Sequence, residues 1–152
     1  MASKIFSQAP KQIARDEMNL RNMSLTAVLV EAEPPVNLAD FGSLTNVCSG
    51  GNYNHIYLQN IGNNSDNRIV DRTGGGIKLV MQAPSWVALS TSTNNPIPGV
   101  VIIESSSSTP GTSSRVLCYL ERTVGGTPTA FIPNGSDTLI FDFATNGILQ
   151  FY

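Results

Sequence analysis

The sequence predicts an all-β domain: an antiparallel β-sandwich or jelly roll of about eight strands, with an N-terminal arm that is not a strand. Short apolar runs separated by turn residues follow one another from Leu25 to the end of the chain, which is the pattern of a sandwich or barrel. The composition agrees, because 16 Ser, 12 Thr, 14 Asn, 13 Gly and 9 Pro leave few residues that favour a helix. No helical pattern of convincing length follows any strand, which argues against parallel βαβ units.

The length favours one folded domain. The chain has 152 residues and a mass of 16.2 kDa, and a chain of this size buries roughly 70% of the surface that its unfolded form exposes. Hydrophobic residues make up 41% and charged residues 13%, and this charged share is about half of the usual one. We predict an arm over residues 1–23 and a β-sandwich domain over residues 24–152.

The arm differs from the remainder of the chain in charge. Residues 1–23 contain four basic and two acidic residues, a net charge of +2, so the remainder carries −4 of the total of −2. Pro10 suits the first turn of a helix that runs to about Asn22, although a helix this short is marginal unless it packs on something. A frayed terminus and an arm that becomes ordered only when it docks on a neighbouring subunit are both left open.

Eight or nine strands are predicted from Leu25 onward, each an apolar run bounded by turn residues. A short helical turn or strand is expected between Leu38 and Phe41, after Pro34 and Pro35 end the first strand. The uncharged run 105–114 is expected to be an exposed loop. The strand ranges are 25–31, 53–60, 68–71, 77–82, 85–91, 99–105, 115–121, 137–143 and 147–152.

The last two of these strands are expected to pair with each other. Residues 144–147 suit a short hairpin loop, because Asn and Gly tolerate positive φ. Alternation places Leu139, Phe141 and Phe143 on one face of the strand. Since an apolar strand at the end of a chain would be an unprotected edge, we expect residues 148–152 to be integral to the sandwich or buried at a subunit interface.

Charge and hydropathy argue against two kinds of partner. A net charge of −2 provides no basic footprint for phosphate contacts, so nucleic acid is not expected. No apolar run approaches the length of a transmembrane helix, and the chain does not begin with a secretory signal pattern, so no membrane partner is expected. Cys48 and Cys118 are too few for a disulfide framework or a four-ligand zinc site. Cys118 is predicted to be a buried free thiol, and whether the two cysteines pair is left open.

No pattern of catalytic residues is found, and the chain is not expected to be an enzyme. The nucleophile elbow Gly-x-Ser-x-Gly is absent, and His55 lies between two Tyr of a predicted strand, where a packed or surface-exposed side chain is expected. The glycines at 50–51 and 74–76 are interpreted as turns, because no Lys-Ser/Thr ending and no helix follow them. No cofactor and no metal are predicted, although an ion in the polar loop 61–76 is left open. Trp86 is predicted to be a core residue, with a surface role in stacking on sugars as the alternative.

Six segments carry a resemblance that covers roughly residues 25–152. They are "LTAVLVEAEPPVNLADFGSL", "TNVCSGGNY", "APSWVALST", "VVIIES", "LCYLE" and "FDFATNGILQF". Their order is similar to that of a family of small virion proteins of tailed bacteriophages, some of which are head decoration proteins. The resemblance implies a compact β-sandwich in an assembled particle, with no catalytic residues to carry over. The arm 1–23 and the Asn/Gly-rich insertion 61–76 depart from the family's pattern.

This resemblance implies a capsid decoration (cement) protein, a homotrimer made in the host cytoplasm and located on the virion. It would bind the outer surface of the head and stabilise the lattice of the major capsid protein. A surface rich in Ser, Thr and Asn suits such a wet interface. A head–tail connector or tail component that forms a ring is one alternative, and a carbohydrate-binding module of a fibre or spike is another. The expected assembly interface consists of apolar residues near the two chain ends, namely Ile5, Phe6, Ile13, Met18, Leu20, Phe151 and Tyr152.

Overall fold

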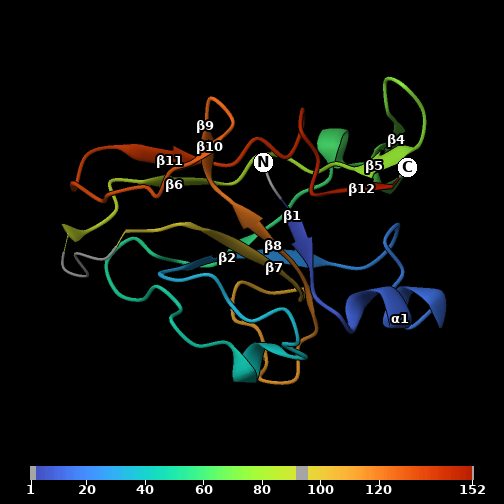
Figure 1. Cartoon of the computed structure of the whole chain (residues 1–152), viewed down its shortest axis with the longest axis horizontal. Helices are drawn as coiled ribbons and strands as arrows, with labels where there is room; N and C mark the ends of the chain where they lie inside the picture. Colours follow the sequence, from blue (N-terminus) through green and yellow to red (C-terminus); the bar gives the residue numbers. More distant parts are fainter. Residues whose placement is uncertain (1–2, 92–95, 152) are drawn as a thin grey trace.

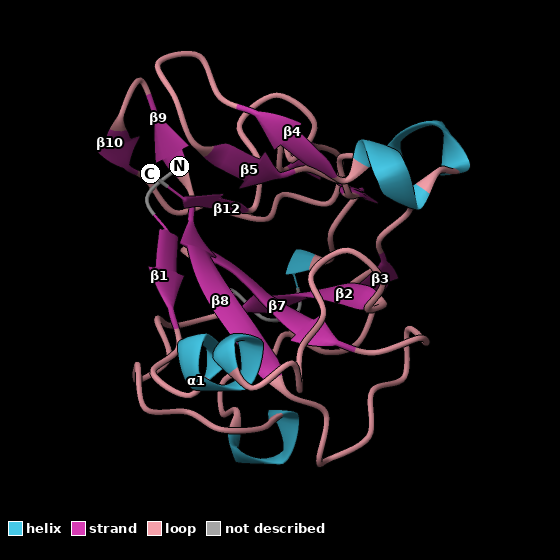
Figure 2. Ribbon diagram, turned by 90° about the vertical axis from the view of Figure 1, so that its right-hand side faces the viewer, coloured by secondary structure: helices cyan, strands magenta, loops and turns pink. Residues whose placement is uncertain are grey.

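The computed structural model of this chain describes residues 3–91 and 96–151 and confirms an all-β fold. The strands form antiparallel sheets in two layers, with the main core between them (Figures 1 and 2). One layer is a single five-stranded sheet. The other consists of a three-stranded sheet and two two-stranded sheets. The described residues contain twelve strands instead of about eight, because several short strands were not expected.

The order of the five-stranded sheet is β1 (Ser3–Ile5), β8 (Val116–Glu121), β7 (Gly99–Glu104), β2 (Leu25–Val30) and β3 (Ile56–Tyr57). The second layer contains the sheet of β12 (Leu149–Phe151), β5 (Ile77–Leu79) and β4 (Ile69–Asp71), the ribbon of β11 (Thr138–Ile140) and β6 (Ser85–Val87), and the hairpin of β10 (Thr127–Pro128) and β9 (Thr123–Val124). The helical segments are α1 (Ala9–Ala14), η1 (Phe41–Ser43), η2 (Ile61–Asn63) and η3 (Ser65–Asn67).

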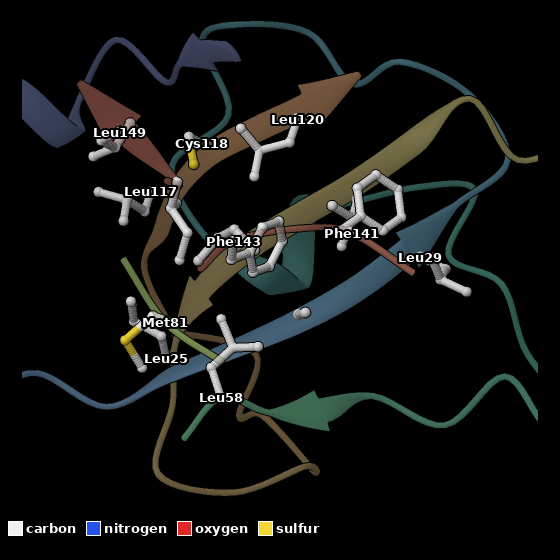
Figure 3. Packing of buried hydrophobic residues seen from close by; sticks show 14 of the residues in the cluster. Leu25, Leu29, Leu58, Met81, Leu117, Cys118, Leu120, Phe141, Phe143 and Leu149 are labelled. Atoms are coloured by element: carbon white, nitrogen blue, oxygen red, sulfur yellow. The ribbon is translucent and has the colours of Figure 1, made fainter. Parts of the chain in front are cut away.

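The main core lies between the two layers (Figure 3). Alternate residues of the central strands face it, among them Leu25 and Leu29 of β2. Phe141 and Phe143 face them from the second layer, with their ring centroids 6.0 Å apart. Both phenylalanines are at most 2% exposed, whereas Ile140, between the inward-facing Leu139 and Phe141, is 57% exposed. The alternation predicted for this stretch is therefore confirmed.

A second, smaller core covers the other face of the five-stranded sheet. Val28 and Val101 point to this side, where Phe6, Leu38 and Leu44 cover them. The central strands are thus buried on both faces, and all six residues of β2 are buried. This double coverage explains why "LTAVLV" and "GVVIIE" are continuous apolar runs, because only a strand with one wet face needs strict alternation.

The structure corrects the expectation that the N-terminal arm contains no strand. Ser3–Ile5 form β1, which pairs antiparallel with β8 at the edge of the five-stranded sheet. Helix α1 ends at Ala14 instead of near Asn22. Asp16 takes a positive φ of 59°, and the amides of Glu17 and Met18 turn back to donate to the carbonyl of Gln12 at 2.8 and 3.1 Å. The arm is therefore folded onto the sandwich within the single chain.

The structure also corrects the expected hairpin of the last two strands. β11 pairs with β6, and β12 pairs with β5. Asp142 accepts a hydrogen bond from the amide of Thr145 at 3.0 Å, and Gly147 follows with a φ of 75°. This turn directs the chain toward β5, where Ile148 donates to the carbonyl of Leu79 at 2.7 Å.

The last strand is integral to the fold, as predicted. Leu149 is 1% exposed and belongs to the main core, against which Phe151 packs. Tyr152 lies outside the described residues. The β9–β10 hairpin was not predicted, although its connection is Gly125-Gly126, both with positive φ, and such a pair is a strong hairpin signal.

Candidate interaction surface

The β6–β11 ribbon has one buried and one exposed face. Trp86 and Leu139 are directly paired across the ribbon and are each 2% exposed, because they face the core. Val87 is 59% exposed and Ile140 is 57% exposed. The register places Val87 opposite Thr138 and Ile140 opposite Ser85, and paired residues in a sheet share a face. The outer face of the ribbon therefore presents two large aliphatic side chains beside two hydroxyl groups.

Two more exposed aliphatic side chains belong to the same layer. Val124 of β9 is 54% exposed, and Ile132, in the link between β10 and β11, is 70% exposed. Figure 1 shows β9 and β10 beside the ribbon, and a groove of about 230 Å³ between Thr123 and Ile140 separates the two. We call the exposed side chains of Val87, Val124, Ile132 and Ile140 the apolar face. Half of the exposed large hydrophobic side chains of the described residues belong to it.

Charge is scarce around the apolar face. Residues 79–103 and 123–136 contain no Lys, Arg, Asp or Glu. The charged side chains at its margins have intramolecular partners: Arg122 donates to the carbonyl of Thr129 at 2.7 Å, Asp137 accepts from the side chain of Asn134 at 2.6 Å, and Asp142 caps the turn before β12. These long uncharged runs are the signal in the sequence that could have indicated the exposed surface. The apolar pattern of the strands could not, because it does not distinguish exposed aliphatic residues from buried ones.

The interface residues expected from the sequence are not brought together on one surface. Phe6 is 2% and Met18 1% exposed, so both are core residues of their own chain. Ile13, Leu20 and Phe151 are partly buried against the main core. Ile5, at 36% exposed on β1, is the one whose side chain is open to solvent, and Tyr152 lies outside the described residues.

Trp86 is a core residue, as predicted. Its indole N–H donates to the carbonyl of Asn54 at 2.7 Å, and its ring meets Phe141 edge to face at 6.2 Å between centroids. Only 2% of the residue is exposed. A sugar ring needs an open aromatic face for stacking, so Trp86 does not provide one.

One groove, of about 240 Å³, contains a cysteine and the histidine, with Cys48, Tyr53 and His55 among its lining residues. Burial raises the pKa of the Cys48 thiol to about 12, and the charge of Glu31 adds to the rise. Burial lowers the pKa of His55, whose ring meets Phe41 edge to face at 5.7 Å. At neutral pH the thiol is protonated and the imidazole neutral, the opposite of the charged pair that activates a cysteine nucleophile.

The remaining candidates for chemistry are dispersed. In residues 3–91 and 96–151, no group of three or more His, Cys, Asp and Glu side chains is arranged to hold a metal ion. In the polar loop 61–76, Asp66 pairs with Arg21 and the side chain of Asn64 caps η3. Cys48 and Cys118 are both free and buried, which confirms the prediction for Cys118. No helix in the described part of the chain has the length and apolar character needed to cross a bilayer.

Comparisons of this chain with protein-family models, with curated proteins and with solved structures found no match.

Proposed function

We propose that this chain is a structural protein of an assembled particle, specifically a capsid decoration protein on the head of a tailed phage. The observation that carries the proposal is the apolar face. Exposed apolar surface on a folded domain marks sites of protein–protein contact. Val87 and Ile140 share the outer face of the ribbon, Val124 belongs to β9 in the same layer, and the few flanking charges are engaged within the chain.

The composition of this surface suits a protein that binds its partner through a broad contact area. Val87 and Ile140 provide the apolar contacts, while Ser85 and Thr138 beside them provide hydroxyl groups. An interface core is depleted of charge and is surrounded by a polar rim that holds water. We therefore infer that the apolar face lies on the outer surface of the capsid, in contact with the major capsid protein.

The proposal is tested by binding to heads assembled from the cognate major capsid protein and lacking this chain. The variant Val87→Asp/Ile140→Asp places two charges on the apolar face. We expect its affinity to fall about tenfold or more, because a charge buried at the centre of an interface has no partner there. Cosedimentation over a range of protein concentrations measures the affinity.

Val36→Asp is the matched control. Val36 is 54% exposed, close to the value for Ile140, but it lies in the loop that covers the opposite face of the five-stranded sheet. We expect this variant to bind heads like the native chain. If the double variant also bound with native affinity, the apolar face would not be the capsid contact and the proposal would lose its support.

The homotrimer and the position on the head remain predictions. Native mass spectrometry of the free protein tests the trimer, and a ring of higher order would favour the head–tail connector or tail component. The carbohydrate-binding alternative depended on an exposed Trp86, and this side chain is 2% exposed.

A further inference from the structure

The outer edge of β11 has four backbone groups without a partner in the described residues. In the ribbon, Ala88 donates to the carbonyl of Asp137 and Phe141 donates to the carbonyl of Pro84. Hydrogen-bonded and non-hydrogen-bonded pairs alternate along an antiparallel ladder. Residues 137, 139 and 141 therefore direct their N–H and C=O groups toward β6, so those of Thr138 and Ile140 point away from it.

Within Thr138–Ile140, the edge of β11 has no charge, proline or bulge, and the groove between Thr123 and Ile140 separates this edge from the β9–β10 hairpin. Natural edges are protected by Lys, by Pro, by a bulge, or by a covering loop or helix. The strand Thr138–Ile140 contains no charge and no proline, and its register with β6 is regular. Figure 1 shows β11 at the outer margin of the molecule. The opposite edge of the ribbon is different, because the side chain of Asn52 donates to the carbonyls of Val87 and Ala88 at 3.1 and 2.9 Å.

We propose that β11 pairs with β11 of a second copy of this chain across a two-fold axis. An antiparallel register centred on Leu139 places Thr138 opposite Ile140 of the second copy, and Ile140 opposite its Thr138. These two hydrogen-bonded pairs use all four free backbone groups of the strand. A two-fold axis requires the same surface on both copies, and one strand edge satisfies this requirement.

The charges near β11 are compatible with this register. Asp137 lies opposite Phe141 of the second copy, and Asp142 lies opposite its Ser136. Like charges directly opposite each other destabilise a strand pair, and this register opposes none. Ser136 is uncharged, and its hydroxyl donates to the side-chain oxygen of Asn134 within its own chain at 3.1 Å, so Asp142 meets no carboxylate at this position.

The pairing produces a continuous four-stranded sheet in the order β6, β11, β11 and β6. Val87, Thr138 and Ile140 of both copies then line one face of that sheet, so two apolar faces join into one. The inference goes beyond the proposed function and does not depend on it, because it concerns the strand edge and not the capsid. Head binding and self-association are measured separately, so either can fail alone.

The first test is the native mass of the complete chain at increasing protein concentration. We expect species of two copies, or of six if the predicted three-fold contact also forms. Thr138→Pro removes an outward N–H that β6 does not use, and proline is tolerated at such an edge position. We expect this variant to keep its β-sheet circular dichroism and to lose the doubling of mass. Thr138→Val keeps the N–H, and this variant is expected to show the same doubling of mass as the native chain.

A disulfide test reports the register and does not depend on the proline variant folding. Paired residues in the hydrogen-bonded positions have Cα atoms about 5.5 Å apart, within reach of a disulfide. When Thr138→Cys and Ile140→Cys proteins are mixed under mild oxidation, we expect a cross-linked dimer that neither protein forms alone. A native chain of only one or three copies at all concentrations, together with no mixed disulfide, would overturn the inference.

Discussion

Arg68 is buried without a carboxylate partner among the hydrogen bonds of the described residues. It is 4% exposed, and its Nε and Nη2 donate to the side-chain oxygen of Asn60 at 2.9 and 2.7 Å. Its Nη1 donates to the carbonyl of Leu20 at 3.2 Å and to that of Met23. Burial lowers its pKa, but a guanidinium remains charged in proteins. Neutral oxygen acceptors therefore stabilise the buried charge. Through these hydrogen bonds the side chain connects the end of the N-terminal arm to the loop before β4.

Replacing Arg68 by Met is expected to lower the free energy of unfolding by about 2 to 3 kcal/mol, because it leaves two carbonyls and Asn60 without their charged donor. Urea denaturation measures the change, and hydrogen exchange should quicken at the amides of residues 20–23. Arg15→Met, at an exposed position, is the control and is expected to change the free energy by less than about 0.5 kcal/mol. Equal stability of the two variants would show that the Arg68 contacts are not needed.

The two cysteines give a prediction about alkaline stability. Burial raises the pKa of both thiols, that of Cys48 to about 12. A thiol that is harder to ionise when folded stabilises the protein below its unfolded pKa, and this contribution is lost as the pH rises. For Cys48 the loss is expected between pH 9.0, the ordinary thiol value, and about 12.

Two measurements check this prediction. Ellman's reagent at pH 8 should label neither thiol in the folded protein and both after unfolding in urea. The variant Cys48→Ala/Cys118→Ala should have a shallower fall of unfolding free energy above pH 9.0 than the native chain. Rapid labelling of the folded protein would contradict the burial of these side chains.

At the scale of elements, the start of β7 depends on a glycine. A Cβ built at Gly99 would lie 2.6 Å from Cε2 of Tyr119 and would also overlap the carbonyl oxygen of Leu120. Because that oxygen belongs to the backbone of β8, it cannot move without disturbing the central strand pair. The close approach lets the ring of Tyr119, 1% exposed, lie over β7 in the smaller core.

Gly99→Ala is therefore expected to destabilise the fold by about 1 to 3 kcal/mol, the usual cost of overpacking a core. Gly111→Ala is the matched control, because the nearest atom to its added Cβ, Oγ of Ser114, is 4.0 Å away. Thermal unfolding of both variants against the native chain measures the difference. If the two variants melted at the same temperature, the contact between β7 and β8 would be more adaptable than the structure indicates.

For the whole molecule, the long strands were more predictable than their pairing. The runs that became β2, β7 and β8 were recognised because both faces of these strands are buried, which makes them continuously apolar. The short strands β1, β9 and β10 were missed, since two or three residues are too few to define a period. The candidate surface was missed for another reason: an exposed aliphatic residue has the same sequence signature as a buried one.

The sequence by itself determined the all-β class, the positions of the main strands, the alternation that buries Leu139, Phe141 and Phe143, and the burial of Trp86 and Cys118. These properties are local, because they depend on side-chain polarity and on turn residues close by in the chain. Only the tertiary structure decided that the arm adds β1 to the sheet, that β11 and β12 pair with different strands, and that the outer side of the β6–β11 ribbon stays exposed. Strand partners and uncovered faces are set by contacts between distant segments, and the hydrophobic pattern of a single strand does not record which segment covers it.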